Sequence, residues 1–178
     1  MIGLTTGRQT SQRLNILLKE LVSTIPNSKI VRRGKSSLEE LGRRFSDDGI
    51  QHAVAIYRWH GGPGRIDLFN VNQALLEQVP PSILLKSVKL RREYAITERP
   101  LCKAITYADT STATRRLGHA ISVILELPEL ESADHTACSL HVRNSNEGFE
   151  AVVTAPAARR EIGPKLTISK PLWSLGED

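Results

Sequence analysis

The sequence predicts an α/β protein with mixed sheets and packed helices, and three observations support this prediction. Apolar residues recur at the spacing of a helical face within residues 14–25, 38–45 and 113–124. Shorter runs between them alternate between apolar and polar residues or are apolar throughout, as β-strands do. The chain has 178 residues, 40% of them apolar, which is enough to bury a core. We expect one domain over residues 1–178, with halves of about 1–80 and 81–178.

The first predicted helix follows a strand-like start at Leu4. Thr10 or Ser11 can cap the helix, because a hydroxyl oxygen accepts a hydrogen bond from a free backbone N–H of the first turn. Pro26 disfavours helical geometry at the residue before it, so the helix should end near Thr24.

A short strand, residues 29–31, should follow the turn after this helix and bring Arg32, Arg33 and Lys35 together. Ser36 and Glu39 have the spacing of a capping box, which predicts that a second helix begins there. Since a helix N-terminus favours anions, we expect the three cations and this helix end to form one phosphate-binding patch.

The second helix should bury Leu38, Leu41 and Phe45 and end at residues 47–49. Residues 53–57 are apolar throughout, which predicts an inner strand covered on both faces.

A hairpin turn is the interpretation of the WHGGPG segment at residues 59–64, because no GK[ST] or GxGxxG motif accompanies its glycines. An alternating strand should follow at residues 65–69. The pattern then predicts a short helix over residues 71–79, ended by two prolines, and a long strand over residues 83–94.

The second half is expected to contain an inner strand at residues 101–107 and a third helix that begins after Ser111. A hairpin of residues 138–143 and 149–154 and a last strand near residues 165–169 complete it. Because the element order is similar in both halves, we expect an internal duplication and a mixed sheet.

The charge balance suits a polyanionic partner. The chain has 24 Lys and Arg against 19 Asp and Glu, a net charge of +5 and a pI near 9.5. Many enzymes are equally basic, so this balance alone does not identify the partner. No signal peptide or membrane-spanning run is visible, so we expect a cytoplasmic protein without a membrane partner.

Catalytic and metal-binding motifs are missing from the sequence. The five histidines are scattered, and neither HExxH nor GxSxG occurs. Cys102 and Cys138 belong to no CxxC motif and are interpreted as buried, reduced strand residues, with a bridge between them left open. We therefore predict no enzymatic activity, no metal, no cofactor and no small-molecule substrate.

Five segments carry a resemblance to a known family. They read LTTGR, SQRLNILLKEL, IPNSKIVRRGKSSLEEL, GGPG and EIGPKLTISK. Together they resemble the Brix-domain family, specifically its small archaeal members that are similar to the Imp-four-type ribosome-assembly proteins of eukaryotes. The resemblance extends over essentially the whole chain. The chain departs from the family pattern at residues 7–11, where the family has Ser-Arg-x-Pro-Ser, and at Lys165 and Leu166, where it has a bulkier aromatic residue.

The resemblance implies a ribosome biogenesis factor that binds ribosomal RNA precursors, or an associated guide RNA, and assists rRNA processing without chemistry of its own. Other ribosome-assembly proteins are the further partners that it implies. The implied fold has two similar α/β halves and resembles the anticodon-binding domain of class II aminoacyl-tRNA synthetases.

Eight cations are the candidates for RNA contact. The resemblance supplies Arg8, Arg13, Arg33, Lys35 and Lys165, and the charge pattern adds Arg32, Arg91 and Arg92. Aromatic residues make up only 4% of the chain, and Tyr57, Trp59 and Tyr94 are interpreted as partly structural. We therefore expect contacts to the RNA backbone more than to bases.

Two other functions fit the sequence. Ile16 and Trp173 would suit a protein-interaction scaffold that does not touch RNA. The implied fold is also compatible with a tRNA-binding module, because a fold does not determine a function.

Overall fold

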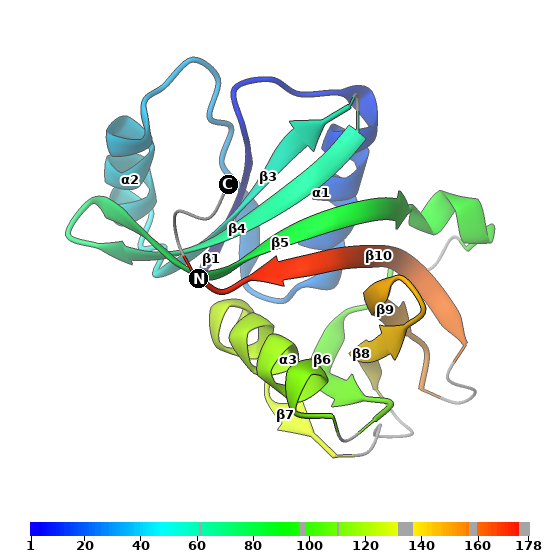
Figure 1. The fold of residues 1–178 in the computed structure, drawn as a ribbon. Helices are drawn as coiled ribbons and strands as arrows, with labels where there is room; N and C mark the ends of the chain where they lie inside the picture. Colours follow the sequence, from blue (N-terminus) through cyan, green and yellow to red (C-terminus); the bar gives the residue numbers. More distant parts are fainter. Residues whose placement is uncertain (61, 97–98, 110, 132–136, 157–159, 175–178) are drawn as a thin grey trace.

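The structure is a computed structural model that describes residues 1–60, 62–96, 99–109, 111–131, 137–156 and 160–174. In the described part of the chain, ten strands form one mixed sheet with three α-helices packed against it, which confirms the predicted mixed α/β class (Figure 1). The elements are β1 (Ile2–Thr6), α1 (Gln12–Thr24), β2 (Ser28–Ile30), α2 (Leu38–Asp47), β3 (His52–Trp59), β4 (Gly62–Asn72), β5 (Leu75–Lys89), the 3₁₀ turn η1 (Arg91–Tyr94), β6 (Cys102–Tyr107), α3 (Thr112–Leu125), β7 (Glu129–Leu130), β8 (Cys138–Ser145), β9 (Gly148–Thr154) and β10 (Glu161–Leu172).

The sheet has the strand order β2-β1-β3-β4-β5-β10-β9-β8-β6-β7. At one end β1 is parallel to β2 and β3, and β3, β4 and β5 then pair antiparallel. At the other end β6 is parallel to β7 and β8, and β8, β9 and β10 then pair antiparallel. The antiparallel β5–β10 ladder joins the two ends. The order of ladders is therefore the same on both sides of this junction.

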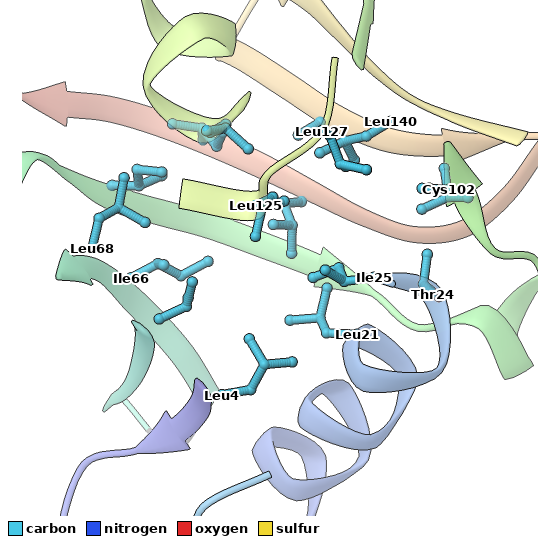
Figure 2. Close-up of a pocket in the computed structure, with 17 residues that line it drawn as sticks. Leu4, Leu21, Thr24, Ile25, Ile66, Leu68, Cys102, Leu125, Leu127 and Leu140 are labelled. Carbon is cyan, nitrogen blue, oxygen red and sulfur yellow. The ribbon is translucent and has the colours of Figure 1, made fainter. Parts of the chain in front are cut away.

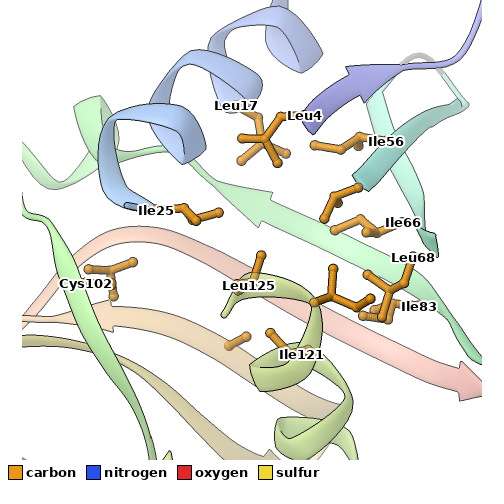
Figure 3. Packing of buried hydrophobic residues seen from close by; sticks show 14 of the residues in the cluster. Leu4, Leu17, Ile25, Ile56, Ile66, Leu68, Ile83, Cys102, Ile121 and Leu125 are labelled. Atoms are coloured by element: carbon orange, nitrogen blue, oxygen red, sulfur yellow. The ribbon is translucent and has the colours of Figure 1, made fainter. Parts of the chain in front are cut away.

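One core extends across the junction. Leu17 of α1, Ile25 directly after it, and Ile121 and Leu125 of α3 belong to the same buried cluster, together with Ile66 and its neighbours on β4 and β5 (Figure 3). Residues of both halves therefore build this core together.

The helix α2 covers the opposite face of the N-terminal half, where Leu41 and Phe45 pack against Ala53 and Ala55. Strand β3 is therefore buried on both faces, as its continuous apolar run predicts.

The core contains a small cavity where the two halves meet, with a volume of about 70 Å³. Figure 2 shows Leu21 from α1, Ile25 directly after this helix and Leu125 from the end of α3 among the side chains that surround it. The lining is entirely apolar, so the cavity offers no hydrogen bond to a water molecule.

Several boundaries agree with the predictions. Helix α1 ends at Thr24 and is capped by Ser11, whose hydroxyl accepts from the Leu14 N–H at 3.3 Å. The hairpins β3–β4 and β8–β9 are also present. Cys102 is buried and lies opposite the half-buried Cys138 in the β6–β8 ladder.

The helix predicted over residues 71–79 was wrong. Strand β4 continues to Asn72, a turn with positive φ at Gln73 and Ala74 follows, and β5 starts at Leu75. The prolines at 80 and 81 lie inside β5 and end no helix. Pairing of residues 75–79 with β4 outweighed the local helical pattern, because the ladder supplies hydrogen-bond partners that the local sequence does not reveal.

Two further details differ from the predictions. The strand predicted to reach Tyr94 ends at Lys89, where the chain enters η1. Leu38, predicted to be buried, is 42% exposed because it occupies the first position of α2.

Candidate nucleic-acid interface

A groove lies at the carboxyl ends of the parallel strands β1 and β2, where the loops after them meet the N-terminal part of α1 (top of Figure 1). Strand β1 sits between β2 and β3, and the helices that follow β1 and β2 pack on opposite faces of the sheet. Open α/β sheets bind ligands at such a crossover, because the two connections leave a crevice between them. The groove has a volume of about 670 Å³.

Four cations line this groove. Arg8, Lys19 and Arg32 are exposed, and Arg33 is half-buried. Among the residues that the structure describes, Arg8, Lys19 and Arg32 have no carboxylate partner. No carboxylate of the described residues therefore neutralises these three positive charges, and the site suits a chain of phosphates.

The backbone around the groove is fixed by burial and by short contacts. Gly7 donates its N–H to the Ile56 carbonyl at 3.0 Å. A Cβ on Gly7 would lie 2.8 Å from the Tyr57 ring, so only glycine allows the chain to pass so close to that ring. Burial, followed by the charge of Asp67, raises the pKa of the Tyr57 phenol, which keeps it neutral beside the groove.

The first turn of α1 strengthens the positive potential of this surface. It contains no acidic residue, so the positive end of the helix dipole is not offset there. Thr10 and Asn15, on either side of this turn, are among the residues that line the groove.

The patch predicted from Arg32, Arg33 and Lys35 forms only in part. Arg32 and Arg33 line the groove. Lys35 is exposed and does not line it, since the lining ends at Gly34. The Arg33 Nε donates to the Ser36 carbonyl at 3.2 Å, which orients its guanidinium.

The predicted cap of α2 was wrong. The cap is Ser37, one residue later than expected, and its hydroxyl accepts from the Glu40 N–H at 3.1 Å. The Glu40 carboxylate accepts from the Ser37 N–H at 2.9 Å, and Glu39 adds a second negative charge. This helix end is capped and carries two acidic side chains, which disfavours an anion there.

Arg13 lies away from the groove and holds η1 against α1. Its guanidinium contacts a Glu93 oxygen at 2.9 Å. The pKa of Glu93 lies below its usual range because its carboxylate accepts from the Leu90 N–H and from Arg13. The charge of Arg13 is thus paired.

Arg91 and Arg92 are part of η1, at a distance along the chain from the groove. The Arg91 N–H donates to the buried Glu20 at 2.8 Å, and its guanidinium donates to the Ser23 hydroxyl at 3.3 Å. Arg92 is exposed.

Lys165 belongs to an ion-pair network on β9 and β10. Its ammonium lies 2.9 Å from Glu150 and 3.8 Å from Glu161, and its side chain is 21% exposed. Burial opposes ionisation of Glu150, but hydrogen bonds from Lys165 and Arg143 lower its pKa below the usual range. This network compensates the charge of Lys165.

Sequence reasoning missed Lys19 and misread Trp59. Lys19 of α1 lines the groove together with Ile30 of β2, a position that depends on how the helix packs. Trp59 is 69% exposed, so its interpretation as a partly structural residue was wrong, whereas Tyr57 and Tyr94 are half-buried. Its position at the end of β3 is the signal that was available, because alternate residues from Ala53 onward become more exposed toward the strand end.

Among the residues described, no three His, Cys, Asp or Glu side chains lie close enough to hold a metal ion. None of the described helices combines the length and apolar character needed to cross a bilayer. The fold and the groove thus define an α/β protein with an open, uncompensated cationic surface.

Comparisons with known proteins specify this class further. No family model matches the chain. It is 27% identical over 181 residues to a probable Brix domain-containing ribosomal biogenesis protein of Aeropyrum pernix, with 94% of each chain covered. It is 27% identical over 133 residues to a protein of the same description from Pyrobaculum aerophilum, with 74% of this chain and 71% of that one covered.

Solved structures show the same fold. The crystal structure of a probable ribosomal biogenesis protein from Aeropyrum pernix K1 has a TM-score of 0.75 and 24% identity, and covers 99% of this chain and 97% of its own. Mil, an archaeal Imp4-like protein, has a TM-score of 0.71 and 18% identity, with 98% and 100% covered. These comparisons confirm the resemblance to Brix-domain ribosomal biogenesis proteins that the sequence predicts.

Proposed function

We propose that this protein is a ribosome biogenesis factor that binds ribosomal RNA precursors, or an associated guide RNA, through phosphates held in the groove of Arg8, Lys19, Arg32 and Arg33. The observation that carries the proposal is the absence of carboxylate partners for three of these cations within the described residues. The descriptions of the relatives support the biological role.

The chemistry of the groove favours phosphate recognition over catalysis. Arginine presents a planar fork of donors that matches phosphate oxygens, and lysine adds a mobile point charge. We propose that the protein assists rRNA processing and assembly in the cytoplasm, together with other assembly proteins and without a cofactor. In this model Arg13 and Lys165 stabilise the fold, because acidic neighbours already hold their charges.

The repeated order of ladders supports an internal duplication of two α/β halves within one domain, which we propose in line with the implied likeness to anticodon-binding domains. We place the boundary between the halves after Lys89, where β5 ends, in place of residue 80. Helix α2 is an addition to the N-terminal half, since no described helix takes its place between β7 and β8.

The experiment compares two triple variants of equal net charge. Arg8→Ala, Lys19→Ala, Arg32→Ala removes three exposed groove cations, whereas Arg43→Ala, Lys86→Ala, Lys170→Ala removes three exposed cations elsewhere. Binding of single-stranded pre-ribosomal RNA is measured at several salt concentrations. Three lost phosphate contacts should flatten the slope of log K against log salt by about two units in the groove variant.

The control variant should keep the slope and most of the affinity. A folded groove variant with unchanged slope and affinity would refute the proposal and favour the protein-scaffold function. Equal competition by tRNA would instead favour the tRNA-binding module.

A further inference from the structure

We propose that Trp59 stacks an unpaired base of the RNA whose phosphates occupy the neighbouring groove. This inference rests on the proposed function and specifies its substrate as single-stranded RNA with at least one unstacked base. Trp59 is the last residue of β3 and is 69% exposed. The indole ring is therefore accessible to a partner from solvent.

The ring is carried by the last pair of a strand ladder. Trp59 pairs with Gly62 in the β3–β4 ladder, and the register shifts just before it, between Tyr57 and Arg58. A Cβ on Gly64 would lie 2.0 Å from the Trp59 Cβ and 3.0 Å from its Cγ. Gly64 therefore makes room for the Cβ and Cγ atoms of Trp59, and this close packing limits the orientation of the indole ring. A pre-oriented ring loses little conformational entropy on binding.

The surroundings of the ring favour a nucleobase. Trp59 lines a shallow hollow of about 390 Å³ with Gln9, Arg58 and His60, all of them polar or cationic. The His60 ring is perpendicular to the indole, at 87° and 5.0 Å between centroids, so the two rings do not stack on each other. A docking site for an apolar protein segment would instead have further apolar residues around the tryptophan.

The hollow and the groove adjoin the same loop. Gln9 lines the hollow, and its neighbours Arg8 and Thr10 line the groove. A strand of RNA that contacts Arg8 through a phosphate therefore passes beside Trp59. This combination of a cationic track with an adjacent aromatic ring is how proteins hold single-stranded nucleic acids.

Intrinsic fluorescence provides the first test. The chain has two tryptophans, Trp59 and Trp173. Trp173→Phe leaves Trp59 as the only emitter and keeps a ring under the Arg116 guanidinium, which lies 3.8 Å from the Trp173 ring. Titration with a single-stranded oligoribonucleotide of about 12 nucleotides should quench the emission. The same oligomer with abasic residues should bind through phosphates but leave the emission largely unquenched.

Substitution of the ring provides the second test. Trp59→Ala should weaken binding of the single strand about tenfold, since stacking strengthens binding about five- to 150-fold per base. The salt slope should stay unchanged, because no phosphate contact is lost. Trp59→Phe should restore most of the affinity, and the abasic oligomer should bind wild type and Trp59→Ala alike.

The two proposals fail in distinguishable ways. Trp59→Ala with wild-type affinity, in a protein whose groove variant shows the flattened slope, refutes the stacking role alone. An unchanged slope in the groove variant refutes the proposed function. Quenching of equal size by the abasic oligomer would also refute stacking, and a loss of protein partners without loss of RNA affinity would assign Trp59 to a protein interface.

Discussion

Filling the cavity between the two halves should stabilise the protein. Val54 of β3 and Val153 of β9 both line it, and each is buried. The double variant Val54→Ile, Val153→Ile adds one methylene from each half and keeps the β-branched shape that strands favour.

The size of the effect follows from the cavity volume. At about 24 cal/mol per Å³, the 70 Å³ cavity costs about 1.7 kcal/mol of unfolding free energy. Two added methylenes contribute about 0.8 kcal/mol each by burial, or about 1.6 kcal/mol together. The two approaches agree, so the gain should be about 1.5 kcal/mol, a rise in Tm of about 3 to 6 °C for a chain of this length.

Urea unfolding followed by circular dichroism measures this gain, with an unchanged m-value as the sign that only stability changed. Val142→Ile is the matched control, because Val142 is fully buried but does not line the cavity. It should destabilise the protein by about 1 to 3 kcal/mol through overpacking. If the double variant lost stability as the control does, the space between α1 and α3 would not be available to side chains.

Two predictions concern the C-terminal half. Burial opposes ionisation of Asp109, but hydrogen bonds from Asn144 and Ser111 lower its pKa below the usual range. Asp109 therefore stabilises the fold above its unfolded pKa near 4, and this contribution disappears as the pH falls toward the lower pKa of the folded state. Asp109→Asn should therefore remove about 1 kcal/mol at pH 7 and less at pH 3 in urea titrations; an equal loss at both pH values would contradict this. Gly118→Ala should destabilise by about 1 to 3 kcal/mol although alanine favours helices, because its Cβ would lie 2.2 Å from the Tyr107 ring. The exposed Val123→Ala on the same helix is the control, and a stabilised Gly118→Ala would show that the ring moves freely.

Local signals predicted the parts of the fold that local physics determines. Pro26 ends α1 and Ser11 caps it, since both effects act within a few residues. The segment after residue 71 was misassigned because its leucines and valine fit a helical face as well as a strand. Only the pairing with β4 decides between the two, and this partner is not visible in the local pattern.

The same distinction applies to the site. Arg32 and Arg33 are adjacent in sequence, so their patch is visible directly. The convergence of Arg8 and Lys19 on that patch depends on the parallel β1–β2 pairing and on the packing of α1. The cap of α2 was misplaced by one residue because residues 36 and 37 are both serines followed three positions later by glutamate, and only the backbone distinguishes them.

The two halves differ at the position that would bind RNA. In the N-terminal half the loop from β1 to α1 carries Arg8, which faces an open groove without a carboxylate partner among the described residues. The loop from β6 to α3 holds the corresponding place in the order of ladders and carries Asp109. Its carboxylate accepts from the Asn144 N–H at 3.0 Å and from the Ser111 N–H at 2.9 Å, which ties this loop to the end of β8.

An acid bound by its own neighbours closes that end of the sheet and repels phosphate, whereas an arginine beside an unfilled groove attracts it. The corresponding loops of the two halves therefore carry opposite charges, Arg8 in one and Asp109 in the other. Under the proposed function, the N-terminal half contacts the RNA backbone, and the C-terminal half contributes α3 and β10 to the shared core that holds the groove in shape.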